Sequence, residues 1–539
     1  MGYIILQNFI TKCHLYCSIN CSFHKFLESV DVMRFLNSVR NLIASWAGQI
    51  VIVIATFITR YYFINILGAE YLGIHGLFAN VLSLMSLAEL GIGVSVGYSL
   101  YQPLADGNIK ILKAIMQLFR KFYYVVGTFI LTAGILVTPF LDLFIKEMPA
   151  NSTEIYMDYI LYVISIGSSY FFSYKVIIII ADQKKYINDL NYCFWFTLQN
   201  IFQIVFLIVT KSYMVYLILQ ILFTFFQNIM ISVMADRRYP FLKEKGTEEL
   251  PQNEISTIKK NSAAMIFQKL GTTIVNATDN LVISKFVGLI TVGIYANYFS
   301  VLNAVNMLVS QMFSAITASV GNYNLSASRK DIEDVFQKAL LINSWAYGFA
   351  SIMLFQLFNP LISLWLGKDY LFSKDILFLI CLNFYFNGMR QSVQNFRNAL
   401  GIYWQDKFKP VVEAALNLVI SIVFVHICST AGVFIGTLVS VLAVTIWWEP
   451  HTLYKNGFKM PMKRYLVRFW LYFVVMMTSF VITLYINKFI AGDNIPSFLF
   501  RALITAAVSN LVFFLFYMRT TEFRALKKMV FELVKHESF

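Results

Sequence analysis

Charged side chains are scarce in this 539-residue chain. Asp, Glu, Lys and Arg make up only 13% of it, whereas hydrophobic residues make up 58% and aromatic residues 17%. The mean hydropathy is +0.65. A water-soluble domain carries roughly twice this share of charge, so the composition excludes that class. The alternating pattern of a membrane-spanning β-barrel is also missing. We therefore expect an all-α polytopic membrane protein.

The chain also lacks the residue groups that catalysis at a membrane surface requires. The expected outer loops are short, no D-x-D carboxylate pair occurs, and no nucleophile, histidine and acid cluster appears. A polymerase or glycosyltransferase is therefore disfavoured, and we expect no enzyme. A scaffold of an export complex is an alternative, but that role does not need aligned charges inside the membrane.

Cysteine is rare, with six residues in all. One cluster precedes the first expected span and consists of Cys13, His14, Cys17, Cys21 and His24. No second cysteine pair closes a tetrahedral site there, so we expect no metal. Residues 1–32 also lack the small-residue cleavage site of a signal peptide. Met33 is followed by a short polar segment that precedes the first expected helix. We therefore interpret residues 1–32, here called the leader, as an upstream extension of the reading frame.

About fourteen stretches are long and apolar enough to cross a membrane as helices. They are 43–67, 74–100, 122–145, 157–181, 190–210, 213–235, 263–287, 292–319, 339–358, 376–397, 409–428, 430–448, 467–488 and 499–518. The outer loops then hold only Lys146, Lys211, Lys368, Lys374 and Lys488. The inner loops hold roughly six times as many basic residues, which places both termini in the cytoplasm. The net charge of +14 thus reflects orientation and contact with anionic lipids rather than nucleic-acid binding.

Two short matches indicate an internal duplication. The motif G-x4-G-I at 68–74 recurs at 288–294, an offset of 220 residues, and Pro139 recurs as Pro360 at an offset of 221. Six spans are an even number, so both copies have the same polarity and the pseudo-symmetry axis lies along the membrane normal.

The expected organisation follows from this duplication. It comprises the leader (1–32), a first six-helix lobe (33–236), a cytoplasmic linker (237–262), a second six-helix lobe (263–450), a loop with two additional helices (451–518) and a basic amphipathic cytoplasmic tail (519–539). We expect the tail to lie on the membrane surface as a helix.

Polar residues inside three spans each gather within about 80° of one helical face, at 100° per residue. They are Ser45, Gln49, Thr56 and Arg60 on the first span; Gln268, Thr272, Asn276 and Asp279 on the seventh; and Asn383, Asn387, Arg390, Gln394 and Arg397 on the tenth. A charge at mid-bilayer costs roughly 2.5–3.5 kcal/mol and usually faces a protein-lined or watery cavity. We therefore expect these stripes, with Lys269 and Glu89, to line a cavity.

The alternative is that the stripes form hydrogen bonds between helices, which explains the amides well. It requires a partner for each charge, for which Glu89 could serve Arg60 and Glu413 could serve Arg390. As a further hypothesis, Asp279 or Glu89 binds or releases a coupling cation, either a proton or sodium. No other cofactor is expected.

Several segments carry a family resemblance. They are Ser86-Leu-Ala-Glu89-Leu-Gly-Ile-Gly93, Leu100-Tyr-Gln-Pro-Leu-Ala105, Arg238-Tyr-Pro-Phe-Leu242, Ala277-Thr-Asp279-Asn280-Leu-Val-Ile-Ser and Gly293-Ile-Tyr295-Ala-Asn297-Tyr298. From about Met33 onward the chain resembles the Wzx-like polysaccharide repeat-unit flippases of the multidrug/oligosaccharidyl-lipid/polysaccharide exporter superfamily. The leader is a departure from the family pattern.

The resemblance implies a V-shaped pair of lobes around a central cavity that opens alternately to each side of the bacterial cytoplasmic membrane. It implies a short glycan on undecaprenyl pyrophosphate as cargo, destined for capsule, exopolysaccharide or O-antigen type polysaccharide, with polymerase and export proteins as partners. Independently, Arg forks suit pyrophosphate oxygens, and amides suit sugar hydroxyls. A lipid II flippase stays open, because its cargo carries the same pyrophosphate. An organic-cation exporter would instead show an acidic and aromatic cavity.

Overall fold

The computed structural model describes residues 47–85, 92–144, 152–182, 184–244, 277–323, 328–400, 402, 405–490, 492 and 494–536. These residues form helices and no strands, which confirms the expected all-α class. Eleven of the described helices are long and apolar enough to cross a membrane. The chain is therefore a multi-pass membrane protein, while the total of fourteen spans stays a prediction. The leader, with its Cys and His residues, lies outside the described residues.

The first group of helices, here called the first lobe, covers the described residues up to 244. Its elements are the helix Ala47–Leu67, α3 (Ala69–Met85), α4 (Ile92–Ala105), α5 (Ile109–Val137) with the 3₁₀ turn η2 (Thr138–Leu143), α6 (Ser152–Ser173), α7 (Val176–Ala181), α8 (Lys185–Thr210), α9 (Tyr213–Arg238) and the 3₁₀ turn η3 (Pro240–Lys243).

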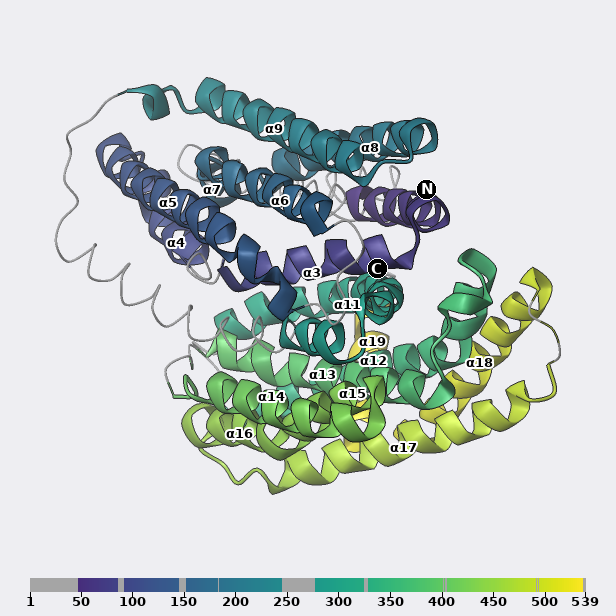
Figure 1. Ribbon diagram of the computed structural model, residues 1–539. Helices are drawn as coiled ribbons and strands as arrows, with labels where there is room; N and C mark the ends of the chain where they lie inside the picture. The colour runs from purple at the N-terminus through teal and green to yellow at the C-terminus, as the bar shows by residue number, and fades with distance from the viewer. Residues whose placement is uncertain are drawn as a thin grey trace.

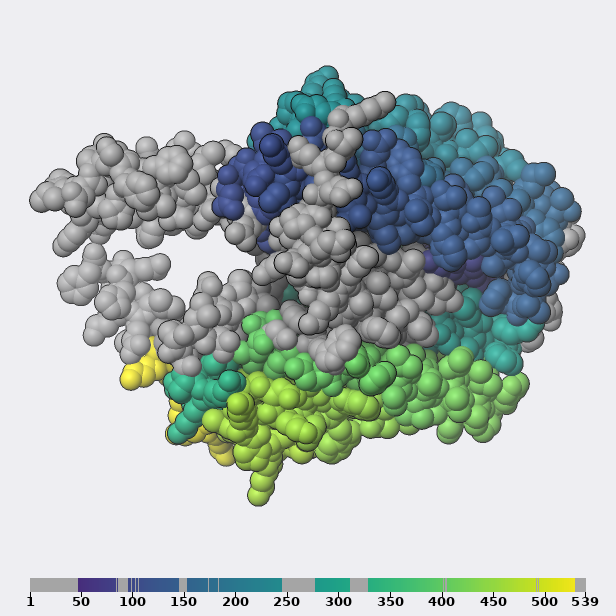
Figure 2. Space-filling view, turned by 90° about the vertical axis from the view of Figure 1, so that its left-hand side faces the viewer, coloured from purple at the N-terminus to yellow at the C-terminus, as the bar shows by residue number. Residues whose placement is uncertain are grey.

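The second group, here called the second lobe, begins with a helix at 277–286. It continues with α11 (Leu289–Tyr323), α12 (Arg329–Trp365), η4 (Lys368–Tyr370), α13 (Lys374–Ala399), α14 (Lys409–Cys428), α15 (Thr430–Ser440), a π-helical turn (Val441–Thr445), α16 (Ile446–Thr452), a second π-helical turn (Leu453–Phe458), α17 (Lys463–Asn487), α18 (Ile495–Tyr517) and α19 (Thr521–His536). Figure 1 shows the two lobes as separate helical bundles that meet where α3 lies along α11. Figure 2 shows them from the side, with the blue and teal first lobe above the green and yellow second lobe.

The contact between α3 and α11 depends on two glycines of the predicted repeat. A Cβ at Gly73 would lie 2.0 Å from the carbonyl oxygen of Leu289, and a Cβ at Gly293 would lie 2.1 Å from the carbonyl oxygen of Ala69. In the predicted repeat Gly73 corresponds to Gly293, and Ala69 corresponds to Leu289. Gly73 contacts Leu289 and Gly293 contacts Ala69, so the contact is reciprocal. The turn just before each helix contains a glycine with positive φ, Gly68 at 91° and Gly288 at 133°.

The helical segment that begins with α15 extends beyond the end that the sequence predicted. The expected span ended at residue 448, and Pro450 follows it, a residue type that usually terminates a helix. In the structure helical backbone continues to Phe458, with Pro450 inside α16 and π-helical turns on both sides of it. Such turns absorb local disruptions of the α-helical ladder. Glu449 therefore lies within the helix and is buried.

The tail forms the helix α19, and the apolar side chains at its beginning pack on the protein. Phe523 stacks on Trp345 of α12, and Leu526 lies in the same apolar layer. Glu522 is buried and pairs with Arg464 and Arg468 of α17. The beginning of the tail is thus docked on α12 and α17 and does not lie alone on the membrane surface.

We expect Gly73→Ala to lower the thermal stability of the protein in detergent. The added methyl group overlaps the backbone of α11, and overpacking of this kind costs about 1–3 kcal/mol. Gly76→Ala is the matched control on the same helix, because its Cβ would meet only the Val292 side chain at 3.5 Å. Equal unfolding midpoints for the two variants would contradict the close approach.

Candidate functional site

A polar cavity of about 310 Å³ lies within the second lobe, between the helix at 277–286 and α11, α13, α14 and α15. Five residues expected from the sequence line it together: Asp279, Asn383, Asn387, Arg390 and Gln394. The tenth-span stripe thus faces a cavity along most of its length. Four aromatic residues complete the wall, namely Tyr295, Phe299, Phe384 and Phe434.

Arg390 is the centre of a buried four-charge network formed by Arg390, Lys409, Glu413 and Glu449. Its guanidinium donates to Glu449 at 2.9 and 3.2 Å and to Glu413 at 3.3 Å. Lys409 Nζ donates to the same two carboxylates, at 2.7 and 2.8 Å. All four side chains are buried. Two cations face two anions, so the network is neutral and Arg390 brings no net charge to the cavity.

Local helix geometry positions this network. Lys409 and Glu413 are one turn apart on α14, so they share a face. Glu449 reaches the network because the helix continues past its expected end at residue 448. Asn387, one turn before Arg390 on α13, accepts a hydrogen bond from the guanidinium at 2.9 Å. The sequence suggested Glu413 as the partner of Arg390, and the structure confirms that pair.

Arg397 lies two turns further along α13 and does not line the cavity. It forms a buried ion pair with Asp406, in the turn that precedes α14. Burial raises the pKa of the Asp406 carboxyl, and the charge of Arg397 opposes that rise. The pair fixes this turn against α13.

Arg60 occupies a different environment, at the contact between the lobes. Its Nη1 donates to the carbonyl oxygen of Ala296 and, at 3.3 Å, to the amide oxygen of Asn297, both on α11. Within the described part of the chain no carboxylate pairs with it. Its suggested partner Glu89 lies outside that part. Among the described residues Arg60 therefore has no carboxylate partner, whereas Arg390 and Arg397 each have one.

Two further contacts join the lobes. Trp365, the last residue of α12, stacks on Phe57 at 4.3 Å and donates to the Phe57 carbonyl. Ser284 donates to the Phe144 carbonyl at 2.6 Å. In the expected topology these residues, like Gly73 and Gly293, lie towards the outer ends of their helices. The described contacts therefore hold the lobes together on the outer side.

Asp279 belongs to a cluster of oxygen acceptors, here called the acceptor cluster, with Asn417 and Thr437. Thr437 Oγ1 lies 2.9 Å from the Asp279 carboxylate and 2.9 Å from Asn417 Nδ2. Within the described part of the chain, the second carboxylate oxygen of Asp279 and the Asn417 amide oxygen are both buried without a hydrogen-bond donor. Buried polar atoms normally have a partner, and a cation is one kind of group that such oxygens can hold.

The remaining sequence-predicted residues lie elsewhere. Thr56 hydrogen-bonds the Ile52 carbonyl of its own helix, and Gln49 is half-buried on that helix. Neither lines the second-lobe cavity. Lys269, Asn276 and Glu89 lie outside the described residues. Across the residues that the structure describes, no three His, Cys, Asp or Glu side chains converge on a metal site.

Sequence reasoning missed four residues of these sites: Lys409, Glu449, Asn417 and Thr437. Lys409 was counted as an inner-loop charge, and Glu449 was placed just outside its span. Asn417 and Thr437 are single polar residues in apolar helices, a pattern that also fits ordinary helix contacts. Only their contacts with residues on other helices show that they belong to these sites.

Comparison with solved structures places this arrangement among known folds. The structure titled "Lipid II flippase MurJ, inward closed conformation" superposes with a TM-score of 0.65 at 16% identity, covering 89% of this chain and 99% of that one. The chain has the fold of the multidrug/oligosaccharidyl-lipid/polysaccharide exporter (MOP) superfamily.

Two MATE transporters support the MOP fold. An inward-facing MATE family transporter of the MOP superfamily matches with a TM-score of 0.59 at 15% identity, covering 78% of this chain and 99% of that one. The Vibrio cholerae MATE transporter VcmN, in its bent form, matches with 0.54 at 13% identity, covering 79% and 98%. No family model and no curated protein matches the sequence. The likeness therefore concerns the superfamily fold, and the Wzx-like subfamily stays a proposal.

We expect Arg390→Gln to lower the unfolding temperature strongly, because it leaves two buried carboxylates with one cation. Removing one partner of a buried ion pair costs about 3–5 kcal/mol. The double variant Arg390→Gln/Glu449→Gln restores neutrality and should recover part of this loss. Thermal unfolding of the purified variants measures both effects. A single variant as stable as the wild type would show that the network is not structural.

Proposed function

We propose that this protein is a flippase. It moves an oligosaccharide repeat unit linked to undecaprenyl pyrophosphate from the inner to the outer leaflet of the bacterial cytoplasmic membrane, by alternating access. The product serves synthesis of a capsule, exopolysaccharide or O-antigen type polysaccharide. The observation that carries the proposal is an apolar groove beside the polar cavity, since the cargo combines a long hydrocarbon tail with a polar head.

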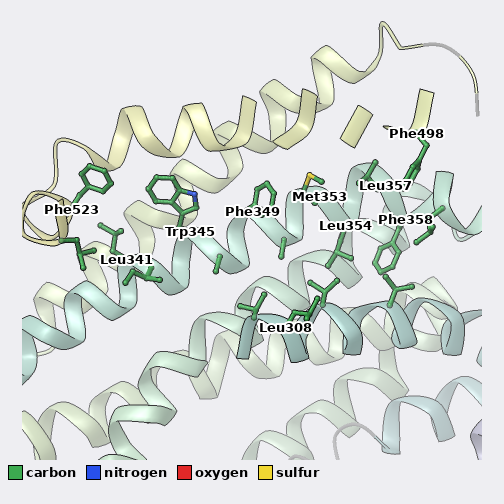
Figure 3. Close-up of a pocket in the computed structure, with 18 residues that line it drawn as sticks. Leu308, Leu341, Trp345, Phe349, Met353, Leu354, Leu357, Phe358, Phe498 and Phe523 are labelled. Carbon is green, nitrogen blue, oxygen red and sulfur yellow. The ribbon is translucent and has the colours of Figure 1, made fainter. Parts of the chain in front are cut away.

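The groove has a volume of about 720 Å³ and lies between α11, α12, α18 and α19 (Figure 3). Its lining on α12 extends from Leu341 to Leu361, which at 1.5 Å per residue is about 30 Å, the thickness of the hydrocarbon core. Trp345, Phe349 and Phe358 point into it. The additional C-terminal helices complete this groove, which suits part of a polyprenyl chain.

Arg60 is the best-supported contact for the pyrophosphate among the three predicted arginines. Arg390 and Arg397 are neutralised by carboxylates, whereas Arg60 is held by neutral acceptors of the other lobe. A phosphate oxygen is a stronger partner for a guanidinium than a carbonyl or an amide. The amides of the second-lobe cavity would meet sugar hydroxyls.

The membrane potential favours the proposed direction. Moving an anionic head outward across an inside-negative membrane gains roughly 2.3 kcal/mol per charge per 100 mV. After the cargo is released, the empty carrier must return to its starting conformation. A coupling cation can supply the driving force for that return. The acceptor cluster around Asp279 is our proposed site for that cation, because its carboxylate, amide and hydroxyl oxygens suit sodium or a proton.

Two alternatives have support of their own. A lipid II flippase is favoured by the MurJ likeness, which covers more of this chain than the MATE likenesses do. An organic-cation exporter is favoured by the composition of the second-lobe cavity, where Asp279 lies among four aromatic residues. The apolar groove distinguishes the lipid cargoes from the soluble cation.

We expect depletion of the protein to accumulate a complete undecaprenyl-linked repeat unit on the inner leaflet, as measured by mass spectrometry of the lipid-linked glycans. Wild type should rescue the cells, whereas Arg60→Gln should fail at an equal protein level. Arg60→Lys should rescue partially, since it keeps the charge but loses the fork.

The matched control is Arg237→Gln, which removes an exposed cation at the inner end of α9 and should rescue fully. Accumulation of lipid II would move the protein to the first alternative. An unchanged glycan pool with altered sensitivity to cationic drugs would move it to the second.

We expect sodium chloride to stabilise the purified protein more than choline chloride at equal ionic strength, if sodium occupies the acceptor cluster. A ligand at 100 times its Kd adds about 2.7 kcal/mol. Asp279→Asn should abolish the difference, whereas Asp375→Asn, an exposed carboxylate on α13, should keep it. Stabilisation that depends on pH but not on sodium would assign the site to a proton. If Asp279→Asn altered neither dependence, the cluster would not be an ion site.

A further inference from the structure

A second polar cavity, of about 440 Å³, lies at the outer ends of α12, α13, α17 and α18. We call it the outer basic pocket. Three cations line it, Lys374, Lys488 and Arg501, together with the amides of Gln356, Asn359 and Asn487. None of its described lining residues is acidic.

Membrane orientation does not explain these cations. The outer loops of this chain hold only five lysines, because basic residues are retained on the cytoplasmic side. Two of the five line this pocket, where they join Arg501. Lys374 is moreover the first residue of α13, where the helix dipole disfavours a cation. A bound anion would relieve both the repulsion between the lysines and the unfavourable dipole.

The shape of the pocket suits the head of a lipid. It reaches Gln356, nine residues before the outer end of α12, which corresponds to a depth of about 13 Å. Leu377, Leu484 and Phe355 supply apolar walls. The cations stand at the outer helix ends, and the apolar residues continue towards the hydrocarbon layer.

Arg501 is fixed in place by the turn between α17 and α18. One nitrogen of its guanidinium donates to the carbonyl oxygens of Ile490 and Gly492, at 2.8 and 3.1 Å. Lys374 and Lys488 are exposed and form no ion pair with another described residue. The two lysines are therefore the groups that can rearrange around a phosphate.

We propose that the outer basic pocket binds the phosphate headgroup of a lipid in the outer leaflet. An anionic phospholipid and a polyprenyl diphosphate share this chemistry. The groove residue Phe498 lies three positions before Arg501 on α18, so a tail can lie close to the headgroup. The proposal does not depend on which cargo the protein moves.

The test is native mass spectrometry of the delipidated full-length protein in detergent. The probes are phosphatidylglycerol, undecaprenyl diphosphate and inorganic phosphate, each titrated separately. The pocket variant is Lys374→Gln/Lys488→Gln, which leaves Arg501 to hold its turn. The control is Lys211→Gln/Lys368→Gln, which removes the same charge from exposed outer positions that do not line the pocket.

We expect the pocket variant to bind the lipid probes about 10–30-fold more weakly than the wild type, since two cation contacts are lost. The control should bind within about twofold of the wild type. Whichever lipid shows the larger loss identifies the source of the phosphate. Equal affinities for the pocket and control variants would overturn the proposal. So would inorganic phosphate that binds as tightly as the lipids, because the site would then recognise a free anion.

Discussion

The absence of water in the hydrocarbon layer dictates the arrangement of polar groups in this protein. A charge buried there must meet an opposite charge or face a cavity. The four-charge network satisfies this condition by joining α13, α14 and α16, three helices that are separate in sequence. Its neutrality explains how a helix with two arginines and several amides can lie inside the bundle. The network also sets one wall of the cavity, because Asn387 and Gln394 lie on the same face of α13 as Arg390.

The contact between the lobes obeys a different constraint, which is close approach of backbones. Gly73 and Gly293 let α3 and α11 touch at the level of their main-chain atoms. Around these glycines, buried apolar side chains of both lobes form one continuous core, which includes Leu72 and Leu77 of α3 and Val292 of α11. The described hydrogen bonds across the contact end mostly on backbone carbonyls. Such bonds are individually modest, with net contributions of about 0.5–1.5 kcal/mol. Separation of the lobes therefore also has to expose the apolar residues that pack around the glycines.

The sequence predicted the helices well because hydropathy and length are properties of single segments. It also predicted the Arg390–Glu413 pair, since few acidic residues were available inside the membrane. It could not predict Glu449, because Pro450 reads as a helix end and the π-helical turns that accommodate it have no clear sequence signal. The polar residues on the helical faces also could not show which arginines are paired with a carboxylate. Arg60, Arg390 and Arg397 look equivalent as polar residues on helical faces, and only their partners on other helices separate them.

Under the proposed function, the distribution of charge bears on how the protein could release an anionic cargo. A cavity with several uncompensated cations would bind pyrophosphate tightly and hold it, and a carrier needs binding that is weak enough to reverse. Here the described cations Arg390, Arg397 and Lys409 of the second lobe are paired with carboxylates, and Arg60 has no carboxylate partner among the described residues. A phosphate that takes Nη1 of Arg60 must displace Ala296 and Asn297, so binding at that nitrogen would weaken the contact that closes the outer side. Closure of that contact would in turn compete with the phosphate for the same guanidinium. Headgroup binding and lobe separation would thus be coupled through one side chain, with the glycine contact as the surface that opens.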